Sequence, residues 1–491
     1  MEQGNRKAQY LIAAAVSLST ATIGVSSGWP TPVIPKLHNN QTSMHFNEQQ
    51  ISWMVALNTP GFVIGSLATS YISDTYGRRS TLLSSALPIA IGTMIVAFFM
   101  EAWLLSVTRL MWGLGTGMIS TVVNIYMAEI TDKDIRARLT VMTKFMFNFG
   151  NLLVIVIGYY VSYNTLNYMM LVLPICYASA CWFTPETPYY YLKEGKVADA
   201  KRVLSKLRKY KNDKELEDAL TLMQQDVKNE MRRSSSFKEL IVGKQYRKAV
   251  IISIGLRIGM VMTGQITTRN YLGRIMQESK SKISLETVFI IFGAVNFLVG
   301  VMSSILVDRV GRRPLLVYSF LGTGLSLALT VGYFFCQEIL RIDEQYLSPY
   351  GVIPFIGIVL STIISGLGYN SIIFTIGAEI FPLNVKSIAM TSLSVLNGIL
   401  GFGVAKGYQE IKNVSGLFGV FFIFTTVAFA SAIFSYYVVP ETKGKSLKEI
   451  QIILQGDMYT EDEKLNHVVT ENINEEEPGE MTELKVFEKK E

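Results

Sequence analysis

The chain has 491 residues, of which 49% are hydrophobic and 17% are charged. Soluble domains carry about 25% charged residues, so this composition argues against a soluble globular chain and favours a membrane protein. The formal net charge is +6, and on a membrane chain an excess of Lys and Arg marks topology, which argues against nucleic acid as a partner.

Apolar runs of about 20 residues, the length that spans a bilayer as a helix, begin close to the N-terminus. The first run follows basic residues and has no clear small-residue cleavage site, so we interpret it as a spanning helix and not as a removed signal peptide. Six runs fall within residues 1–192, at about 9–33, 51–72, 80–100, 104–127, 139–162 and 167–184.

A polar stretch at 193–246, rich in Lys, Glu and Leu, predicts a linker domain of short amphipathic helices on the cytosolic surface. Six more apolar runs lie within residues 247–456, at about 249–272, 286–307, 314–336, 352–378, 387–409 and 415–439. Residues 457–491 form an acidic tail that we predict to be cytosolic and disordered. The expected fold is an all-α membrane protein with twelve transmembrane helices in two six-helix halves.

Positive charge is concentrated in the loops that follow even-numbered runs, for example at Arg78, Arg138 and Arg312. Because cytoplasmic loops carry the excess of Lys and Arg, we expect both termini in the cytoplasm. The first external loop then contains Asn40, in an Asn-Gln-Thr triplet that is an acceptor for N-glycosylation.

Three short motifs occur twice in the same order, each at the cytosolic end of an even-numbered helix. Residues 74–79 read Asp-Thr-Tyr-Gly-Arg-Arg, and residues 308–313 read Asp-Arg-Val-Gly-Arg-Arg. A Glu-Ile pair with a basic residue seven positions after the Glu occurs at 129–136 and at 379–386, and Pro-Glu-Thr occurs at 185–187 and at 440–442. The copies are 234, 250 and 255 residues apart, which predicts two parallel repeated halves. In transporters built this way the solute site lies between the halves near the membrane midplane.

Together with Pro-Glu-Thr-Lys-Gly at 440–444, these motifs resemble the sugar porters of the major facilitator superfamily, over about residues 9–455. Within that family the chain is similar to the insect facilitated trehalose transporter type, in its short first external loop, in residues 188–192 and in Lys406. The resemblance implies a plasma-membrane uniporter that moves a sugar such as trehalose or a hexose by alternating access. Proton-coupled relatives carry an acid in the first helix, and residues 9–33 contain no Asp or Glu, so we do not expect proton coupling.

The arginines of the repeated motifs lie near carboxylates at neighbouring helix ends, and an arginine can bind a carboxylate through two parallel hydrogen bonds. We expect these groups to pair when the cytosolic side is closed and to separate when the two halves rock apart. The alternative is that the arginines only fix the topology. The predicted cytosolic gate comprises Asp74, Arg78, Arg79, Glu129, Arg136, Glu186, Asp308, Arg312, Arg313, Glu379, Lys386 and Glu441.

The solute site departs from the sugar-porter pattern. Lys144 stands where the family has a glutamine in helix 5, helix 7 lacks the amide side chains of the family, and Asn397 is retained in helix 11. Residues 370–374 (Asn-Ser-Ile-Ile-Phe) replace a Gly-Pro-x-Pro-Trp stretch that lines the cavity in the family. The resemblance and the remaining side chains predict substrate contacts from Lys144, Asn148, Arg257, Thr263, Gln265, Asn370, Phe374 and Asn397.

Lys144 and Arg257 are embedded cations, with no Asp or Glu deep in the same helices. Charges at such depth usually face a cavity, although long side chains also reach the interface. A positive cavity favours an anionic solute, so a carrier of another small solute, such as an organic anion, is the second hypothesis, and a sensor that binds without transport is the third. Three scattered histidines, three cysteines in apolar context and the lack of a phosphate-binding loop predict no metal, no cofactor and no enzyme. The sequence gives no indication of the oligomeric state.

Overall fold

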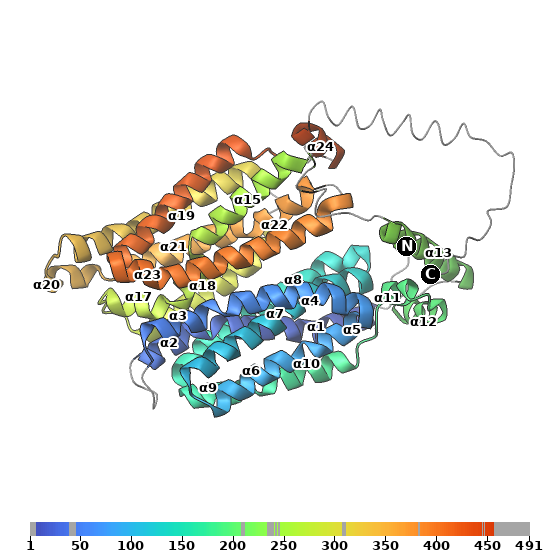
Figure 1. Ribbon diagram of the computed structural model, residues 1–491, viewed down its shortest axis with the longest axis horizontal. Helices are drawn as coiled ribbons and strands as arrows, with labels where there is room; N and C mark the ends of the chain where they lie inside the picture. Colours follow the sequence, from blue (N-terminus) through green and yellow to red (C-terminus); the bar gives the residue numbers. More distant parts are fainter. Residues whose placement is uncertain are drawn as a thin grey trace, which may run out of the picture.

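The computed structural model describes residues 6–38, 46–207, 212–232, 240, 243, 246–306, 311–381, 383–443, 445 and 447–455. All regular structure in these residues is helical, and the long helices run side by side along the longest axis of the molecule (Figure 1). The predicted acceptor Asn40 and the acidic tail at 457–491 lie outside these residues.

The N-terminal half contains six membrane-crossing segments, several of them built from two helices in succession. Gly77, with φ 96° and ψ 164°, turns the chain between the second and third crossings, in a conformation that is essentially restricted to glycine. Trp29 lies in the core of this half, edge-to-face on Trp112 at 5.3 Å, and its indole N–H donates to Asn167 at 2.9 Å. The helices are α1 (Arg6–Gly28), α2 (Pro30–His38), α3 (Glu48–Ala56), α4 (Asn58–Tyr76), α5 (Arg78–Ser84), α6 (Ala86–Phe98), α7 (Ala102–Ile130), α8 (Lys133–Tyr160), α9 (Tyr163–Met170) and α10 (Val172–Trp182).

Three short helices follow the sixth crossing: α11 (Pro188–Lys193), α12 (Val197–Leu207) and α13 (Asp213–Arg232). Thr187 caps the first of them, with its hydroxyl accepting from the N–H of Tyr190. The helices pack on one another through a small apolar cluster that includes Leu204 and Leu220, and Lys201 pairs with Glu217 across α12 and α13 at 2.8 Å. They lie beside the end of the helical body in Figure 1.

The C-terminal half repeats the arrangement; glycines interrupt two of its crossings, and a third glycine separates its last two crossings. Gly264 has φ 70° between α15 and α16, Gly368 separates α21 from α22, and Gly416 has φ 67° within α23. The helices are α15 (Arg247–Met262), α16 (Gln265–Asn270), α17 (Leu272–Glu278), α18 (Leu285–Leu306), α19 (Arg312–Phe334) with the π turn η2 (Phe335–Ile339), α20 (Glu344–Leu347), the 3-10 turn η3 (Ser348–Tyr350), α21 (Ile353–Leu367), α22 (Tyr369–Ile380), α23 (Leu383–Val438) and α24 (Leu447–Gln455).

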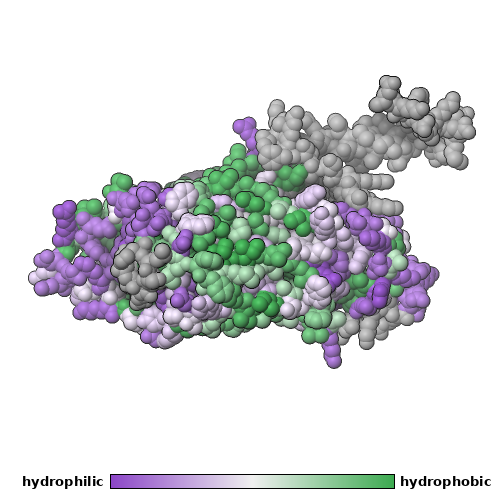
Figure 2. All heavy atoms as spheres, turned by 60° about the horizontal axis from the view of Figure 1, so that its bottom comes forward, coloured by the Kyte–Doolittle hydropathy of each residue, from purple (hydrophilic) through white to green (hydrophobic). Residues whose placement is uncertain are grey.

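Eleven segments are long and apolar enough to cross a membrane, and the last of them, Ile388–Val438, has 51 residues. This last segment consists of two helices that meet at the non-helical Gly416, so the described chain makes the twelve crossings that the sequence predicts. Figure 2 shows an apolar band across the middle of the face in view, with hydrophilic residues gathered at both ends of the molecule. This distribution is expected for a body whose middle faces lipid.

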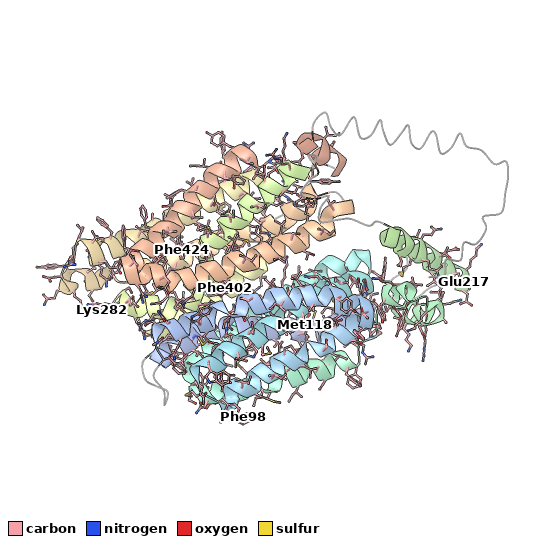
Figure 3. All side chains as sticks on the ribbon, viewed as in Figure 1. Phe98, Met118, Glu217, Lys282, Phe402 and Phe424 are labelled. Carbon is pink, nitrogen blue, oxygen red and sulfur yellow. The ribbon has the colours of Figure 1, made fainter. Side chains whose placement is uncertain are left out.

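The two ends of the molecule differ in how the two halves meet. We call the end that carries Gly77, Glu186 and Glu441 the motif end, and the end that carries Glu48 and Glu278 the opposite end. The helix pairs that make most of the contacts between the halves are α2 with α16 and α17, α3 and α4 with α23, and α8 with α18. Figure 3 shows Glu217 near the motif end, Lys282 near the opposite end and Phe402 of α23 facing the N-terminal half, where its ring lies 6.1 Å from that of Trp53.

Candidate functional site

A charged network occupies the motif end of the N-terminal half. Arg78 Nη2 lies 3.1 Å from Glu129 Oε1, and the Thr187 hydroxyl donates to Glu129 Oε2 at 2.5 Å. The backbone N–H groups of Arg78 and Arg79 both donate to Glu186, at 3.0–3.2 Å. The carboxylates therefore hold the start of α5, the end of α7 and the segment after α10 together.

The C-terminal half repeats this network group for group. Arg312 Nη2 lies 3.4 Å from Glu379 Oε1, and the Thr442 hydroxyl donates to Glu379 Oε2 at 2.6 Å. The N–H groups of Arg312 and Arg313 donate to Glu441 at 2.9 and 3.1 Å. The three sequence repeats thus form one three-dimensional motif, present once in each half.

Glu186 and Glu441, the two acids that accept hydrogen bonds from backbone N–H groups, differ in the direction in which their pKa is shifted. Burial raises the pKa of Glu186 above its usual 4.5, although the N–H groups of Thr187, Arg79 and Arg78 favour its charged form. Burial acts on Glu441 in the same sense, but the backbone N–H groups around it, led by that of Lys443, outweigh burial and lower its pKa.

The side chains of Arg79 and Arg313 differ from the prediction, because neither pairs with an acid in the described structure. Arg79 Nη2 donates to the carbonyl of Trp182 at 2.5 Å, and its guanidinium lies 5.5 Å from the Trp182 ring. Arg313 makes the equivalent contacts with the carbonyl and the ring of Tyr436. These two arginines therefore fasten the ends of the sixth and twelfth crossings.

The gate hypothesis needs revision in one respect, because the pairs described at the motif end lie within a half and not between the halves. Asp74 also stays within its half, 3.5 Å from Arg78 and 2.9 Å from Lys193. The ion pairs at the motif end are formed in this state, in which the polar contacts between the halves lie toward the opposite end. Separation of the halves at the motif end therefore does not require that these pairs break. Asp308 and the side chains of Arg136 and Lys386 lie outside the described residues.

The described polar contacts between the halves lie toward the opposite end, whereas packing contacts such as Phe145 of α8 on Phe297 of α18 lie nearer the middle. Arg274 Nη2 of α17 pairs with Glu48 Oε1 of α3 at 2.5 Å, and Lys406 Nζ lies 4.9 Å from the Trp53 ring. The Thr31 hydroxyl donates to the carbonyl of Arg269 at 3.1 Å. Cross-half contacts of this kind close the opposite end in this structure.

Two broken helices meet where the sequence predicts part of the solute site. The hydroxyls of Thr263, just before the break at Gly264, and Tyr369, just after the break at Gly368, lie 3.0 Å apart. The Tyr369 ring stacks on Phe320 at 4.1 Å, and the Gln265 side chain lies near the Tyr369 hydroxyl. Irregular backbone at membrane depth requires burial within protein or a polar cavity, and such breaks mark solute sites in transporters.

Arg257 and Phe374 form a second cluster on the same two crossings. The guanidinium carbon of Arg257 lies 4.0 Å from the centroid of the Phe374 ring. Arg257 is buried, whereas Phe374 is 47% exposed. Arg257 precedes Thr263 by six residues on α15, and Phe374 follows Asn370 by one turn of α22. The structure therefore places five of the predicted contact residues, including Gln265, on two adjacent crossings.

The remaining predicted contacts lie on helices at the boundary between the halves. Lys144 is exposed on α8, and its carbonyl accepts from Asn148 Nδ2 at 2.9 Å. Asn148 in turn packs against Gly300 of α18, since a Cβ there would meet Asn148 Nδ2 at 2.2 Å. Asn397 of α23 has a buried Oδ1 without a hydrogen-bond partner in the described structure. No group of three or more His, Cys, Asp or Glu residues that could hold a metal occurs within the described ranges.

The sequence matches the family described as "Sugar (and other) transporter" over residues 11–454. The chain belongs to this family. The chain is similar to the facilitated trehalose transporter Tret1 of Bombyx mori, with 28% identity over 91% of this chain and 86% of the relative. It is also similar to Tret1 of Apis mellifera ligustica, with 26% identity over 90% of this chain and 87% of the relative. The Drosophila willistoni relative is 28% identical, and the match covers 91% of this chain but only 51% of that longer protein.

The fold of this chain is similar to those of solved transporter structures. The inward open conformation of the xylose transporter XylE from E. coli has a TM-score of 0.74, with 18% identity over 91% of this chain and 99% of that chain. The proton:xylose symporter XylE bound to 6-bromo-6-deoxy-D-glucose has a TM-score of 0.71, with 19% identity over 92% and 100%. The fold is thus that of the major facilitator superfamily, as predicted.

The sequence did not predict three features of the candidate site and its surroundings in this chain. Tyr369 is at the centre of the broken-helix cluster, but a tyrosine within an apolar run carries no distinguishing signal. The hydroxyls of Thr187 and Thr442 complete the repeated networks, and their recurrence in Pro-Glu-Thr was the available clue. The pair of Glu48 and Arg274 joins residues 226 positions apart, and no local pattern connects them.

Proposed function

We propose that the chain is a facilitative carrier that moves a sugar, such as trehalose or a hexose, across the plasma membrane by alternating access. The observation that carries this proposal is the contrast between the two ends. The described polar contacts between the halves lie toward the opposite end, whereas the repeated networks at the motif end each stay within one half. This is the arrangement of a carrier closed on one side of the membrane.

In this proposal the motif end faces the cytosol and both termini are cytoplasmic. The excess of Lys and Arg in the loops of this end supports the orientation. Each network would hold the cytosolic ends of its own half together, so that the half moves as one body when the carrier changes state. Rocking of two such bodies around a central site is the motion expected of transporters with repeated halves.

The solute would bind between the halves, at the broken helices of the C-terminal half. Thr263, Gln265 and Tyr369 supply hydroxyl and amide groups there, and sugar hydroxyls need such partners in exchange for water. The names of the insect relatives, facilitated trehalose transporters, support a sugar as the solute. The helix α1 contains no Asp or Glu, which supports transport driven by the solute gradient alone.

Uptake of radiolabelled trehalose and glucose into proteoliposomes that contain the purified full chain tests this proposal. A carrier is expected to give saturable uptake that levels off when the inside and outside concentrations are equal. Uptake no faster than into empty liposomes, with binding of the same sugars to the purified protein, would identify a sensor instead. Uptake of organic anions but of neither sugar would favour the second hypothesis.

A further inference from the structure

A buried cation at the candidate solute site lacks a partner of opposite charge. Arg257 is 1% exposed, and its Nη2 has no hydrogen-bond partner in the described structure. The contact described for its guanidinium is the face of Phe374, at 4.0 Å. An aromatic face compensates only part of the hydration that a guanidinium loses on burial.

The described helices around Arg257 have no carboxylate that is free to pair with it. Neither α15 nor α16 contains an Asp or Glu. The single acid of α22, Glu379, binds Arg312 and Thr442, and the single acid of α23, Glu410, lies 3.5 Å from Lys406. Glu449 on α24 has interactions of its own. A negative charge for Arg257 would therefore have to come from outside these helices.

The position of Arg257 relative to the polar groups at the helix break suggests where that charge comes from. Thr263 is six residues further along the same crossing, which is about 9 Å at the rise of an α-helix. A monosaccharide derivative has about this length, so one molecule could reach both places. Phe374 lies over the guanidinium and is itself 47% exposed, so the proposal requires a shift of this ring to bring a solute to Arg257.

We propose that Arg257 binds an acidic group of the transported solute, which would then be a sugar acid or a sugar phosphate and not a neutral sugar. The carboxylate or phosphate would accept parallel hydrogen bonds from the guanidinium, and the hydroxyls would be bound at Thr263 and Gln265. This assignment rests on the proposed carrier function, but it replaces the neutral sugar proposed above with an acidic sugar derivative as the solute.

Ligand-dependent thermal stability of the purified full chain tests the assignment with D-glucose, D-glucuronate and glucose 6-phosphate as probes. A ligand that binds the native state raises the melting temperature with its concentration, which gives an apparent Kd. The wild-type protein is expected to bind at least one of the two acids about 10- to 100-fold more tightly than D-glucose, because a hydrogen bond to a charged group is stronger than one to a neutral group. The two acids distinguish a carboxylate site from a phosphate site.

Variants of Arg257 assign the preference to this side chain. Arg257→Gln is expected to abolish the preference, so that the apparent Kd values for the acid and for D-glucose become similar, and Arg257→Lys is expected to retain part of the preference. Arg247→Gln, which removes an exposed arginine from the start of the same helix, serves as the matched control and is expected to behave as wild type. The wild-type comparison of acid with neutral sugar needs no variant, so it tests the acidic substrate class even if Arg257→Gln does not fold, and Arg257→Lys then tests the side chain.

Equal binding of D-glucose and both acids by the wild type, or binding of none of them, would overturn the assignment. An acid preference that survives in Arg257→Gln would overturn it as well. If neutral sugars cross proteoliposomes but the acids neither bind nor cross, this inference fails and the sugar carrier stands. If an acid binds through Arg257 but nothing crosses, the assignment stands and the carrier function fails.

Discussion

Replacement of Glu48 by glutamine tests whether an ion pair holds the opposite end closed. Glu48 of α3 and Arg274 of α17 belong to different halves, and their side chains are 34% and 16% exposed. Glutamine keeps the shape of the side chain but removes its charge. Arg274 retains a second carboxylate, Glu278, 3.2 Å from its Nε, so the change removes one cross-half pair without leaving an unpaired cation.

The size of the effect follows from the partial burial of the pair. At an effective dielectric constant of about 20, two unit charges about 4 Å apart attract by about 4 kcal/mol. Loss of hydration and ordering of both side chains oppose this attraction. A partly buried ion pair therefore has a net stabilising free energy of about 1–2 kcal/mol. Glu48→Gln should therefore raise the ratio of opposite-end-open to opposite-end-closed protein about 5- to 30-fold.

Spin labels on two exposed residues of the opposite end provide the assay. Trp103 at the start of α7 and Tyr346 in α20 belong to different halves, and both are exposed. With these two residues changed to cysteine and the three native cysteines to serine, the distance distribution reports the two populations. Glu48→Gln should increase the population at longer distance.

The pair of Lys280 and Glu344 provides the matched control. It lies at the same end at 2.6 Å, but both residues belong to the C-terminal half. Glu344→Gln should leave the distance distribution unchanged. An unchanged distribution in Glu48→Gln, or an equal change in both variants, would refute the reasoning.

Three further predictions concern the motif end and the exposed cation. Gly77→Ala should lower the melting temperature far more than Gly311→Ala, because Gly77 has φ 96° whereas Gly311 has φ −63°; similar losses in thermal scans would contradict this. Because its folded pKa is lowered, the Glu441 carboxylate contributes stability that is fully present above pH 4.5, the usual pKa of the group, and that is lost as the pH falls through the folded pKa. Because the folded pKa of Glu186 is raised, this residue contributes stability that is present below pH 4.5 and that is lost as the pH rises through its folded pKa. The melting temperature of Glu441→Gln relative to wild type should therefore fall as the pH rises toward about 4.5 and level off above it, and that of Glu186→Gln should rise as the pH rises above about 4.5; slopes of the same sign would show that the assignment is wrong. Lys144→Gln should change the free energy of unfolding by less than about 0.5 kcal/mol, because Lys144 is exposed and has no described ion pair; a larger loss in denaturant titration would mean that its charge has a buried partner.

The sequence was sufficient for the fold because the features that define it are local or repeated. Apolar length predicts each crossing, and the spacing of the repeated motifs predicts the two halves. The pairing of Arg78 with Glu129 and of Arg312 with Glu379 also follows, since helix ends that recur in the same order bring these groups together.

The candidate site was less accessible to sequence reasoning because it depends on helix faces and on breaks. The pattern alone identifies Arg257 as an embedded cation but cannot show that Phe374, 117 positions later, covers it. The hydroxyl pair of Thr263 and Tyr369 requires knowledge that two crossings break at the same depth. The sequence does not show which way a side chain turns at the end of a helix, so it could not place Arg79 and Arg313 on Trp182 and Tyr436 in this state.

Counterflow in proteoliposomes tests the central claim, that this chain carries a solute by alternating access without proton coupling. Liposomes that contain the full chain are loaded with unlabelled solute, either trehalose or D-glucose with D-glucuronate, and the entry of labelled solute is followed with and without a pH gradient. The account predicts a transient accumulation of label above equilibrium that depends on the internal solute and is the same with and without the gradient. No accumulation with any of these solutes, or accumulation only when a pH gradient is imposed, would contradict it.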